Sequence, residues 1–208
     1  MRVIGGMLVL AVASSWWTAT PDVARAAGYC TSGINDSWFA GWISHGAASP
    51  VPEGVSATLT YRRAASCQLG LYWNAGYSGW VMVQGLWQAH EYAQAGFFFD
   101  GNPLSCIQNF SEYNNNFILP VRRLIGCVKD GEVHVPKVVY FTGTGGHVRM
   151  YVDSTLFDET TFCICGWAQP FQAFYSGEAH DLNGDVPGLA ATKTDWSNMQ
   201  IQYTNVNT

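Results

Sequence analysis

Most of the chain consists of short runs of Val, Tyr, Phe, Trp and Thr, separated by Gly, Pro, Asn and Asp. No long stretch shows the spacing of apolar positions that marks a helix. This pattern is typical of β-strands joined by tight turns, and it predicts an all-β protein. The strands are expected at Ser56–Tyr61, Gln68–Trp73, Trp80–Glu91, Tyr92–Phe99, Cys106–Tyr113, Val135–Thr142, His147–Asp153, Thr160–Cys165, Phe171–Ala179 and Met199–Asn205.

Bulky apolar residues occupy both alternating positions of several expected strands, as in Trp80 and Met82 with Val81 and Val83. A sheet with one face in water has apolar residues at every second position only, so this pattern favours two stacked sheets. Together with regularly spaced turn signals, it predicts a two-sheet antiparallel jelly-roll (concanavalin-like) sandwich.

Two segments depart from the strand pattern. Pro120–Ile125 is expected to form a short helix, because Pro is favoured at the first helical position. Cys30–Glu53 is rich in Gly, Ser and Ala, and we expect it to wrap around the sandwich, tied by Cys30.

The N-terminal segment has the features of a secretory signal peptide. Arg2 supplies a positive start, Val3–Trp17 is apolar apart from Gly and Ser, and Ala24 and Ala26 are small residues of the kind that signal peptidase recognises. The apolar run is shorter than the roughly 20 residues that a membrane span needs. We therefore expect residues 1–26 to be a signal peptide, residues 27–208 to form a single β-sandwich domain, and the protein to be secreted and extracellular.

Composition narrows the possible partners. Of the 208 residues, 48% are hydrophobic and 12% are charged, which is about half the charged fraction of an ordinary soluble domain. The formal net charge is −5, so the chain has no basic field with which to hold a nucleic-acid backbone or an anionic bilayer. We expect neither nucleic acid nor a membrane as a partner.

The six cysteines are an even number in a chain expected to reach an oxidising compartment, and they predict up to three disulfides with the pairing left open. Cys163 and Cys165 point the same way if they lie on a strand, so each is expected to bridge to another segment. The five histidines show no spacing typical of a metal site, and no metal or other cofactor is expected.

Most of the acidic residues lie at turn signals, but Glu91 and Glu178 do not. Strand alternation places Glu178 on the same face as Phe174, Ser176 and His180, and Gly177 beside it lets another backbone or a ligand come close. No G-x-S-x-G motif is present, which disfavours a serine hydrolase. Glu178 is therefore the leading candidate for a site residue.

Two stretches resemble strands of the glutamic peptidases of the eqolisin and neprosin families. Tyr92–Phe99, which contains Gln94, is similar to the strand that carries the first catalytic residue just before a pair of small residues. Tyr175–Asp181 is similar to the neprosin strand that carries the second catalytic Glu ahead of a Gly-rich turn. The separation of 84 residues (178 minus 94) and the intervening F-x-E-Y segment Phe110–Tyr113 also suit these families.

The resemblance implies a secreted endopeptidase that acts on polypeptides in acid without a cofactor. Gln94 occupies the place of the eqolisin Gln, where neprosins have Glu, and Glu178 matches the Glu that both families share. An ionised Glu178 would accept a proton from the attacking water, and the Gln94 amide would stabilise the oxyanion. The candidate substrate-binding residues are Trp80, Trp87, Tyr92 and His180.

Two alternatives remain open. Jelly-roll sandwiches with many Trp and Tyr residues often bind sugars, so a non-catalytic carbohydrate- or surface-binding module, with a polysaccharide as partner, is the second hypothesis. A glycoside hydrolase that pairs Glu178 with Glu91 or Glu112 is the third, and it requires two carboxyl groups across a cleft.

Overall fold

The computed structural model describes thirteen stretches of the chain, and all structural statements below concern these stretches. They are residues 38–44, 52–63, 68–69, 72–73, 77–85, 90–100, 104–115, 119–141, 146–161, 163, 167, 171–179 and 194–203. The predicted signal peptide, residues 1–26, lies outside them. No helix that is long and apolar enough to cross a membrane occurs within the described part of the chain.

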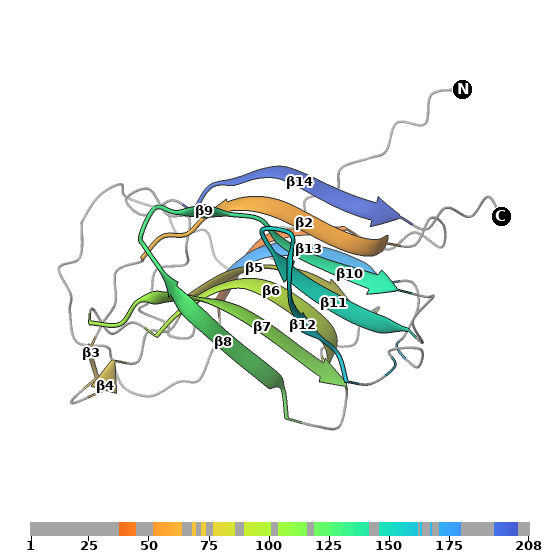
Figure 1. Ribbon diagram of the computed structural model, residues 1–208, viewed down its shortest axis with the longest axis horizontal. Coiled ribbons are helices and arrows are strands. Elements are labelled where there is room, and N and C mark those ends of the chain that lie inside the picture. The colour runs from red at the N-terminus through yellow and green to blue at the C-terminus, as the bar shows by residue number, and fades with distance from the viewer. Residues whose placement is uncertain are drawn as a thin grey trace, which may run out of the picture.

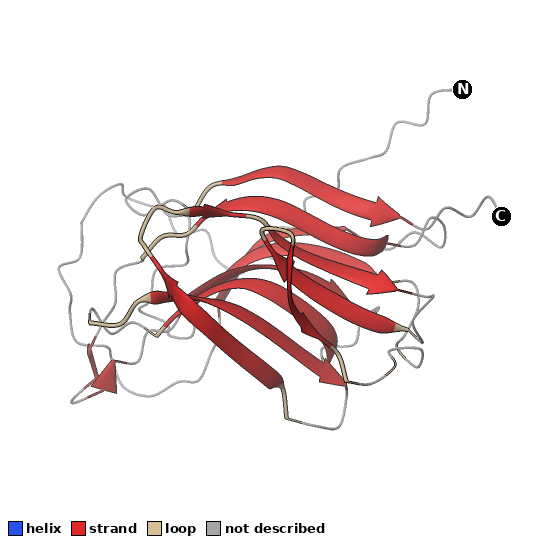
Figure 2. Cartoon of the chain, in the orientation of Figure 1, coloured by secondary structure: helices blue, strands red, loops and turns tan. Residues whose placement is uncertain are grey.

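The described residues form β-strands joined by loops and turns, which confirms the predicted all-β class (Figure 2). The strands are β1 (Trp38–Ser44), β2 (Pro52–Thr60), β3 (Gln68–Leu69), β4 (Tyr72–Trp73), β5 (Tyr77–Gln84), β6 (Glu91–Phe99), β7 (Ile107–Asn115), β8 (Val121–Val128), β9 (Val133–His134), β10 (Pro136–Phe141), β11 (His147–Val152), β12 (Thr155–Glu159), β13 (Gln172–Ala179) and β14 (Trp196–Tyr203).

Two antiparallel sheets make up the sandwich (Figure 1). The first sheet has the strand order β1-β13-β5-β6-β7-β8. The second has the order β12-β11-β10-β2-β14, with β9 paired to β2, while β3 and β4 form a separate small hairpin. The central strands of the second sheet contact β5, β6 and β13 of the first. The predicted two-sheet antiparallel jelly-roll sandwich is therefore confirmed.

The hydrophobic core lies between the two sheets. On β6, Ala93, Ala95 and Phe97 all point inward and are fully buried. The second sheet contributes residues such as Leu59 and Met150 to the same cluster. Fully burying a side chain of the size of Leu or Phe stabilises a fold by about 1.5–3 kcal/mol, so this alternation fixes which face of β6 is inside.

Several predicted elements were wrong in kind or position. Pro120–Ile125 is not a helix, because Val121–Val128 forms β8 at the edge of the first sheet. The residues of β8 up to Cys127 are exposed, so the sequence has no alternation of buried and exposed positions that would indicate a strand. Pro120 does not argue against a strand here, because an edge strand tolerates a Pro at its start. The strand expected over Trp80–Glu91 ends at Gln84.

Further differences concern the N-terminal segment and the second sheet. Within Cys30–Glu53, expected to be a wrapping loop, Trp38–Ser44 forms edge strand β1. The strand expected at Thr160–Cys165 is displaced to Thr155–Glu159, and the described residues of the predicted segment are not in a strand. The turn at Asp153 and Ser154, where both residues have positive φ, allows β12 to fold back onto β11.

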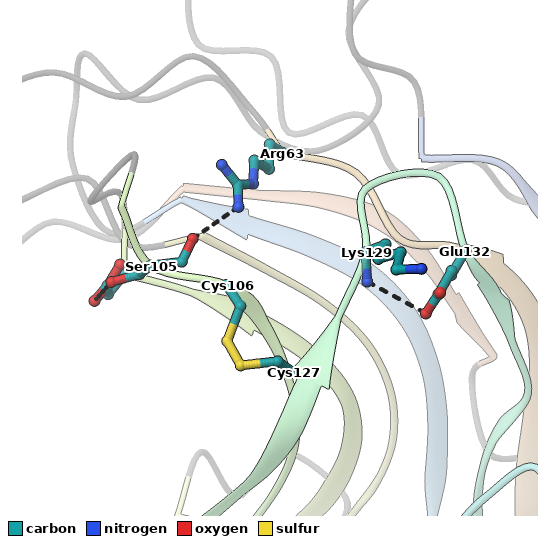
Figure 3. The surroundings of a disulfide bond; sticks show 7 residues. Arg63, Ser105, Cys106, Cys127, Lys129 and Glu132 are labelled. Atoms are coloured by element: carbon teal, nitrogen blue, oxygen red, sulfur yellow. Dashed lines mark hydrogen bonds between the residues drawn. A yellow bond between two sulfur atoms is a disulfide. The ribbon is translucent and has the colours of Figure 1, made fainter.

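A disulfide joins Cys106, just before β7, to Cys127 near the end of β8 (Figure 3). Beside it, Arg63 donates a hydrogen bond from Nη2 to the backbone oxygen of Ser105 at 2.8 Å. Cys163 is also disulfide-bonded, so each cysteine in the described stretches is oxidised, as the even count predicts. The Cys106–Cys127 bond fixes edge strand β8 to its single neighbour in the first sheet.

Candidate functional site

The first sheet has a second face, turned away from the second sheet, which we call the outer face. It is formed by the side chains that alternate with the core residues of β5, β6, β7 and β13. A small apolar cluster of Trp80, Met82 and Phe110 lies there, separate from the main core. Polar side chains surround this cluster and are buried as well, among them Gln94, Glu112 and Glu178.

Strand register arranges these side chains in rows across the sheet. One row runs through Met82, Gln94, Glu112 and Arg122 on four successive strands, β5 to β8. The next row along contains Trp80 on β5, opposite Gly96 on β6. A third row contains Glu178 on β13. Residues of one row are direct neighbours, because adjacent strands lie about 4.8 Å apart.

Trp80 lies midway between Gln94 and Glu178. Gln94 lies on the neighbouring strand β6, in the row on one side of Trp80. Glu178 lies on the other neighbouring strand, β13, in the row on the opposite side. The indole Nε1 of Trp80 donates a hydrogen bond to Oε2 of Glu178 at 3.2 Å. The two residues that sequence analysis expected to act together therefore lie on the same face, with the indole ring between them.

Neighbouring strands approach one another closely in this part of the sheet. A Cβ atom added to Gly96 would lie 2.0 Å from the backbone oxygen of Gly79 on β5, and one added to Gly41 would lie 2.0 Å from the backbone oxygen of Tyr175 on β13. Only glycine permits such approaches. β5, β6 and β7 are visibly bowed in Figure 1.

Burial and nearby charges on the outer face shift the pKa of Tyr92. Burial raises the pKa of this phenol well above its ordinary value, and the charge of Glu112, the hydrogen bond to it and the charge of Glu178 raise it further, whereas Arg122 lowers it. The charges of Glu112 and Glu178 thus both act on the Tyr92 phenol, and that of Glu112 has the larger effect.

Glu112 is the centre of a hydrogen-bond network on this face. Its Oε1 accepts hydrogen bonds from the Tyr92 hydroxyl at 2.6 Å and from Nε2 of Gln94 at 3.2 Å. Its Oε2 accepts one from Nε of Arg122, which forms a salt bridge with it. The Arg122 guanidinium also lies over the Phe98 ring, 5.2 Å from its centroid. Glu112 therefore binds three donors, two from β6 and one from β8, the strands on either side of β7.

Among the residues that the structure describes, three buried polar side-chain atoms on the outer face have no hydrogen-bond partner. They are Oγ of Ser78, Oδ1 of Asn114 and Nε2 of Gln172, on β5, β7 and β13. Buried polar groups without a partner are uncommon, because each costs about 1–3 kcal/mol. Because these atoms are enclosed, an ordered water is the kind of partner that would satisfy them.

The other predicted site residues are distributed as follows. Tyr92 is partly buried on the outer face, and Trp80 is buried there with 3% exposure. Trp87 and His180 lie outside the described residues. Glu91 was considered as a partner for Glu178. It lies two residues before the inward-facing Ala93 on β6, so its side chain belongs to the opposite face of the sheet.

Arg122 is the site residue that sequence analysis missed, because its segment was expected to be a helix. Glu112 was noted only within the F-x-E-Y segment and as a possible glycosidase carboxylate. Sequence alternation places Glu112 with Phe110 on one face of β7, but its pairing with Gln94 and Arg122 depends on register. The weak signal that the sequence offers is the pair of consecutive arginines at 122 and 123 in an otherwise apolar segment.

Comparison with solved structures identifies glutamic peptidases with the same fold. Scytalido-glutamic peptidase with a peptide-based transition state analog has a TM-score of 0.52 and 16% sequence identity, and the match covers 81% of each chain. SCP-B, a member of the eqolisin family in complex with the tripeptide Ala-Ile-His, has a TM-score of 0.50 and 16% identity, with 80% of each chain covered. At this identity the similarity shows the fold alone.

Two further comparisons, with protein families and with curated proteins, found no match. A glycoside hydrolase family protein from Mycobacterium thermorestibile also has a similar structure, with a TM-score of 0.45, 11% identity and coverage of 77% of this chain and 65% of that one. This weaker similarity supports no functional inference.

Proposed function

We propose that the protein is a glutamic-type endopeptidase that hydrolyses peptide bonds with Glu178 and Gln94. The observation that supports this most directly is the placement of both side chains on the outer face of one sheet, on either side of Trp80, with each held by a hydrogen bond. The fold that the chain shares with eqolisin peptidases is consistent with this role.

Glu178 is the general base of the proposed reaction. Its ionised carboxylate takes a proton from a water molecule as the water attacks the peptide carbonyl, and then returns that proton to the leaving amine. The hydrogen bond from Trp80 Nε1 to Oε2 orients the carboxylate. Because Glu178 is buried at 9% exposure, few water molecules compete for it.

Gln94 stabilises the negative charge that develops on the carbonyl oxygen. Its side-chain amide carries two N–H donors, and the bond to Glu112 uses one of them. The second N–H is the proposed oxyanion donor. In other hydrolases the removal of one such donor costs about 2.7–4 kcal/mol of transition-state stabilisation.

The substrate and setting follow from the same proposal. The substrate is a polypeptide in an extended conformation. The enzyme acts in acid, where the leaving amine is readily protonated. We further propose that it is secreted after removal of residues 1–26.

Digestion of a denatured protein at pH about 3–4 tests the peptidase proposal. Wild type is expected to cleave the substrate, whereas Glu178→Gln, which keeps the shape but removes the base, is expected to lose at least about 100-fold of kcat. Glu159→Gln is the matched control, because Glu159 pairs with Arg149 in the second sheet, away from the outer face. Equal cleavage by wild type and Glu178→Gln, or cleavage by neither, would refute the proposal.

The two alternatives have less support in the described residues. Among these residues, the exposed large aromatic side chains are Trp42 and Tyr203, which belong to different sheets and form no common platform for a sugar. Glu112 is bound by three donors and Glu91 belongs to the opposite face, so neither is arranged as the second carboxyl of a glycosidase. Retention on an insoluble polysaccharide, unchanged in Glu178→Gln, would instead favour the binding module.

A further inference from the structure

We propose that Glu112 is a positioning residue that sets the orientation of the Gln94 side-chain amide, and that Tyr92 and Arg122 hold Glu112 in place for this task. The inference rests on the proposed function, since it explains how one amide N–H of Gln94 becomes directed to the reaction. It assigns to Glu112 a role that acts through Gln94 rather than through direct contact with the substrate.

Strand register makes this contact possible. Gln94, Glu112 and Arg122 are direct cross-strand neighbours on β6, β7 and β8. Side chains that are opposite one another on the same face of adjacent strands have Cβ atoms about 4.5–5.5 Å apart, which suits a Gln–Glu hydrogen bond. The observed distance from Nε2 of Gln94 to Oε1 of Glu112 is 3.2 Å, and both residues are buried.

The chemistry of the two groups makes the contact directional. An amide has a donor end and an acceptor end that differ little in shape, so packing alone does not select one orientation. An ionised carboxylate only accepts hydrogen bonds. Glu112 therefore attracts the NH2 end of Gln94 and repels its carbonyl oxygen, which must point away from β7. With one N–H fixed on Glu112, the direction of the second is determined as well.

Glu112 is itself restrained from both sides. The Tyr92 hydroxyl shares Oε1 with Gln94, and Arg122 binds Oε2. Because burial and the charge of Glu112 raise the pKa of Tyr92, this hydroxyl stays protonated and remains a donor in acidic and neutral solution. The Arg122 guanidinium is held in turn by the Phe98 ring. These contacts leave the Glu112 carboxylate little freedom to rotate away from Gln94.

A double-mutant cycle separates this role from a structural one. In the wild-type background, Glu112→Gln is expected to lower kcat about 10- to 100-fold with KM changed less than about twofold, since a hydrogen bond to a charged group is lost. In a Gln94→Ala background, the same substitution is expected to change kcat less than about twofold, because the group that it positions is absent. Glu112→Asp, which keeps the carboxylate, is expected to recover part of the activity.

If Glu112→Gln lowered kcat by the same factor in the wild-type and Gln94→Ala backgrounds, the inference would be overturned. Full activity of Glu112→Gln in the wild-type background would also overturn it. Glu159→Gln, which breaks the comparable pair with Arg149 on the second sheet, serves as the control and is expected to retain wild-type kcat. If wild type itself does not cleave peptides, the proposed function has failed, and activity no longer tests the orientation.

An NMR measurement tests the orientation without activity. The side-chain NH2 resonances of Gln94, identified by their loss in Gln94→Glu, are expected to include one proton shifted by the bond to the carboxylate and slow to exchange. In Glu112→Gln, with the rest of the spectrum retained as evidence of folding, this shift and protection are expected to disappear. Unchanged Gln94 resonances in folded Glu112→Gln would overturn the inference.

Discussion

At the scale of single residues, Trp80 has the largest influence on the outer face. It fills the centre of the small apolar cluster with Met82 and Phe110, and it also donates the hydrogen bond to Glu178. Tryptophan suits this position because its ring is large and apolar while its N–H supplies a single donor at the edge. The opposing Gly96 leaves room for the backbone of β5 to approach closely at this point.

Trp80→Phe is expected to lower kcat/KM about tenfold or more, because Phe preserves an aromatic ring but removes the donor to Glu178. Steady-state kinetics on a peptide substrate measures this effect. Phe110→Leu is the control, since it reduces packing in the same cluster without removing a donor, and it is expected to retain most of the activity. Equal losses in both variants would show that packing alone explains the effect of Trp80.

At the scale of elements, β8 connects an edge of the first sheet to the candidate site. It pairs with β7, is fastened by the Cys106–Cys127 disulfide and contributes Arg122 to the Glu112 network. Positive φ at Gly126 accompanies a register shift between β7 and β8. An edge strand has neighbours on one side only, so its position depends more on such covalent and ionic links than that of a central strand.

Removal of this disulfide is expected to lower the free energy of unfolding by about 2–4 kcal/mol, because the bond closes a loop over a sequence separation of 21. Denaturant unfolding of the double variant Cys106→Ser, Cys127→Ser measures the change. Part of the proposed peptidase activity is expected to remain, since Gln94 and Glu178 lie on other strands. An unchanged free energy of unfolding would contradict the role assigned to the bond.

At the scale of the whole molecule, buried tyrosines connect stability to pH. Burial raises the pKa values of Tyr61, Tyr92 and Tyr175, and the charge of Asp153 adds to the effect at Tyr61. In the unfolded chain these phenols ionise at about pH 10. The folded protein keeps their protons above this pH, so the stability that they contribute is complete below about pH 10 and declines as the pH rises further.

Alkaline titration is therefore expected to show two groups of tyrosines. The buried group should form tyrosinate only as the fold is lost, so that its absorbance step coincides with the loss of near-UV circular dichroism. Tyr92→Phe is expected to reduce the amplitude of this late step while leaving the earlier ionisation unchanged. Ionisation of all tyrosines near pH 10 in a protein that remains folded would contradict the prediction.

Much of the fold was predictable because alternation is a local property of the chain. Alternating residues on β6 and β13 place Gln94 and Glu178 each on a definite face of its own strand, and the predicted strands include most of both. Edge strands β1 and β8 were missed because the described side chains there are largely exposed, which removes the burial pattern that sequence analysis uses.

The sequence by itself determined the all-β class, the stacked sheets and the residue types available for chemistry, since these follow from periodicity and composition. The tertiary structure decided that Trp80 lies between Gln94 and Glu178, that Glu112 binds Gln94, and that Cys106 pairs with Cys127. These contacts join residues far apart in the chain. They depend on cross-strand register, which is set by the packing of whole sheets and by close backbone approaches such as that at Gly96.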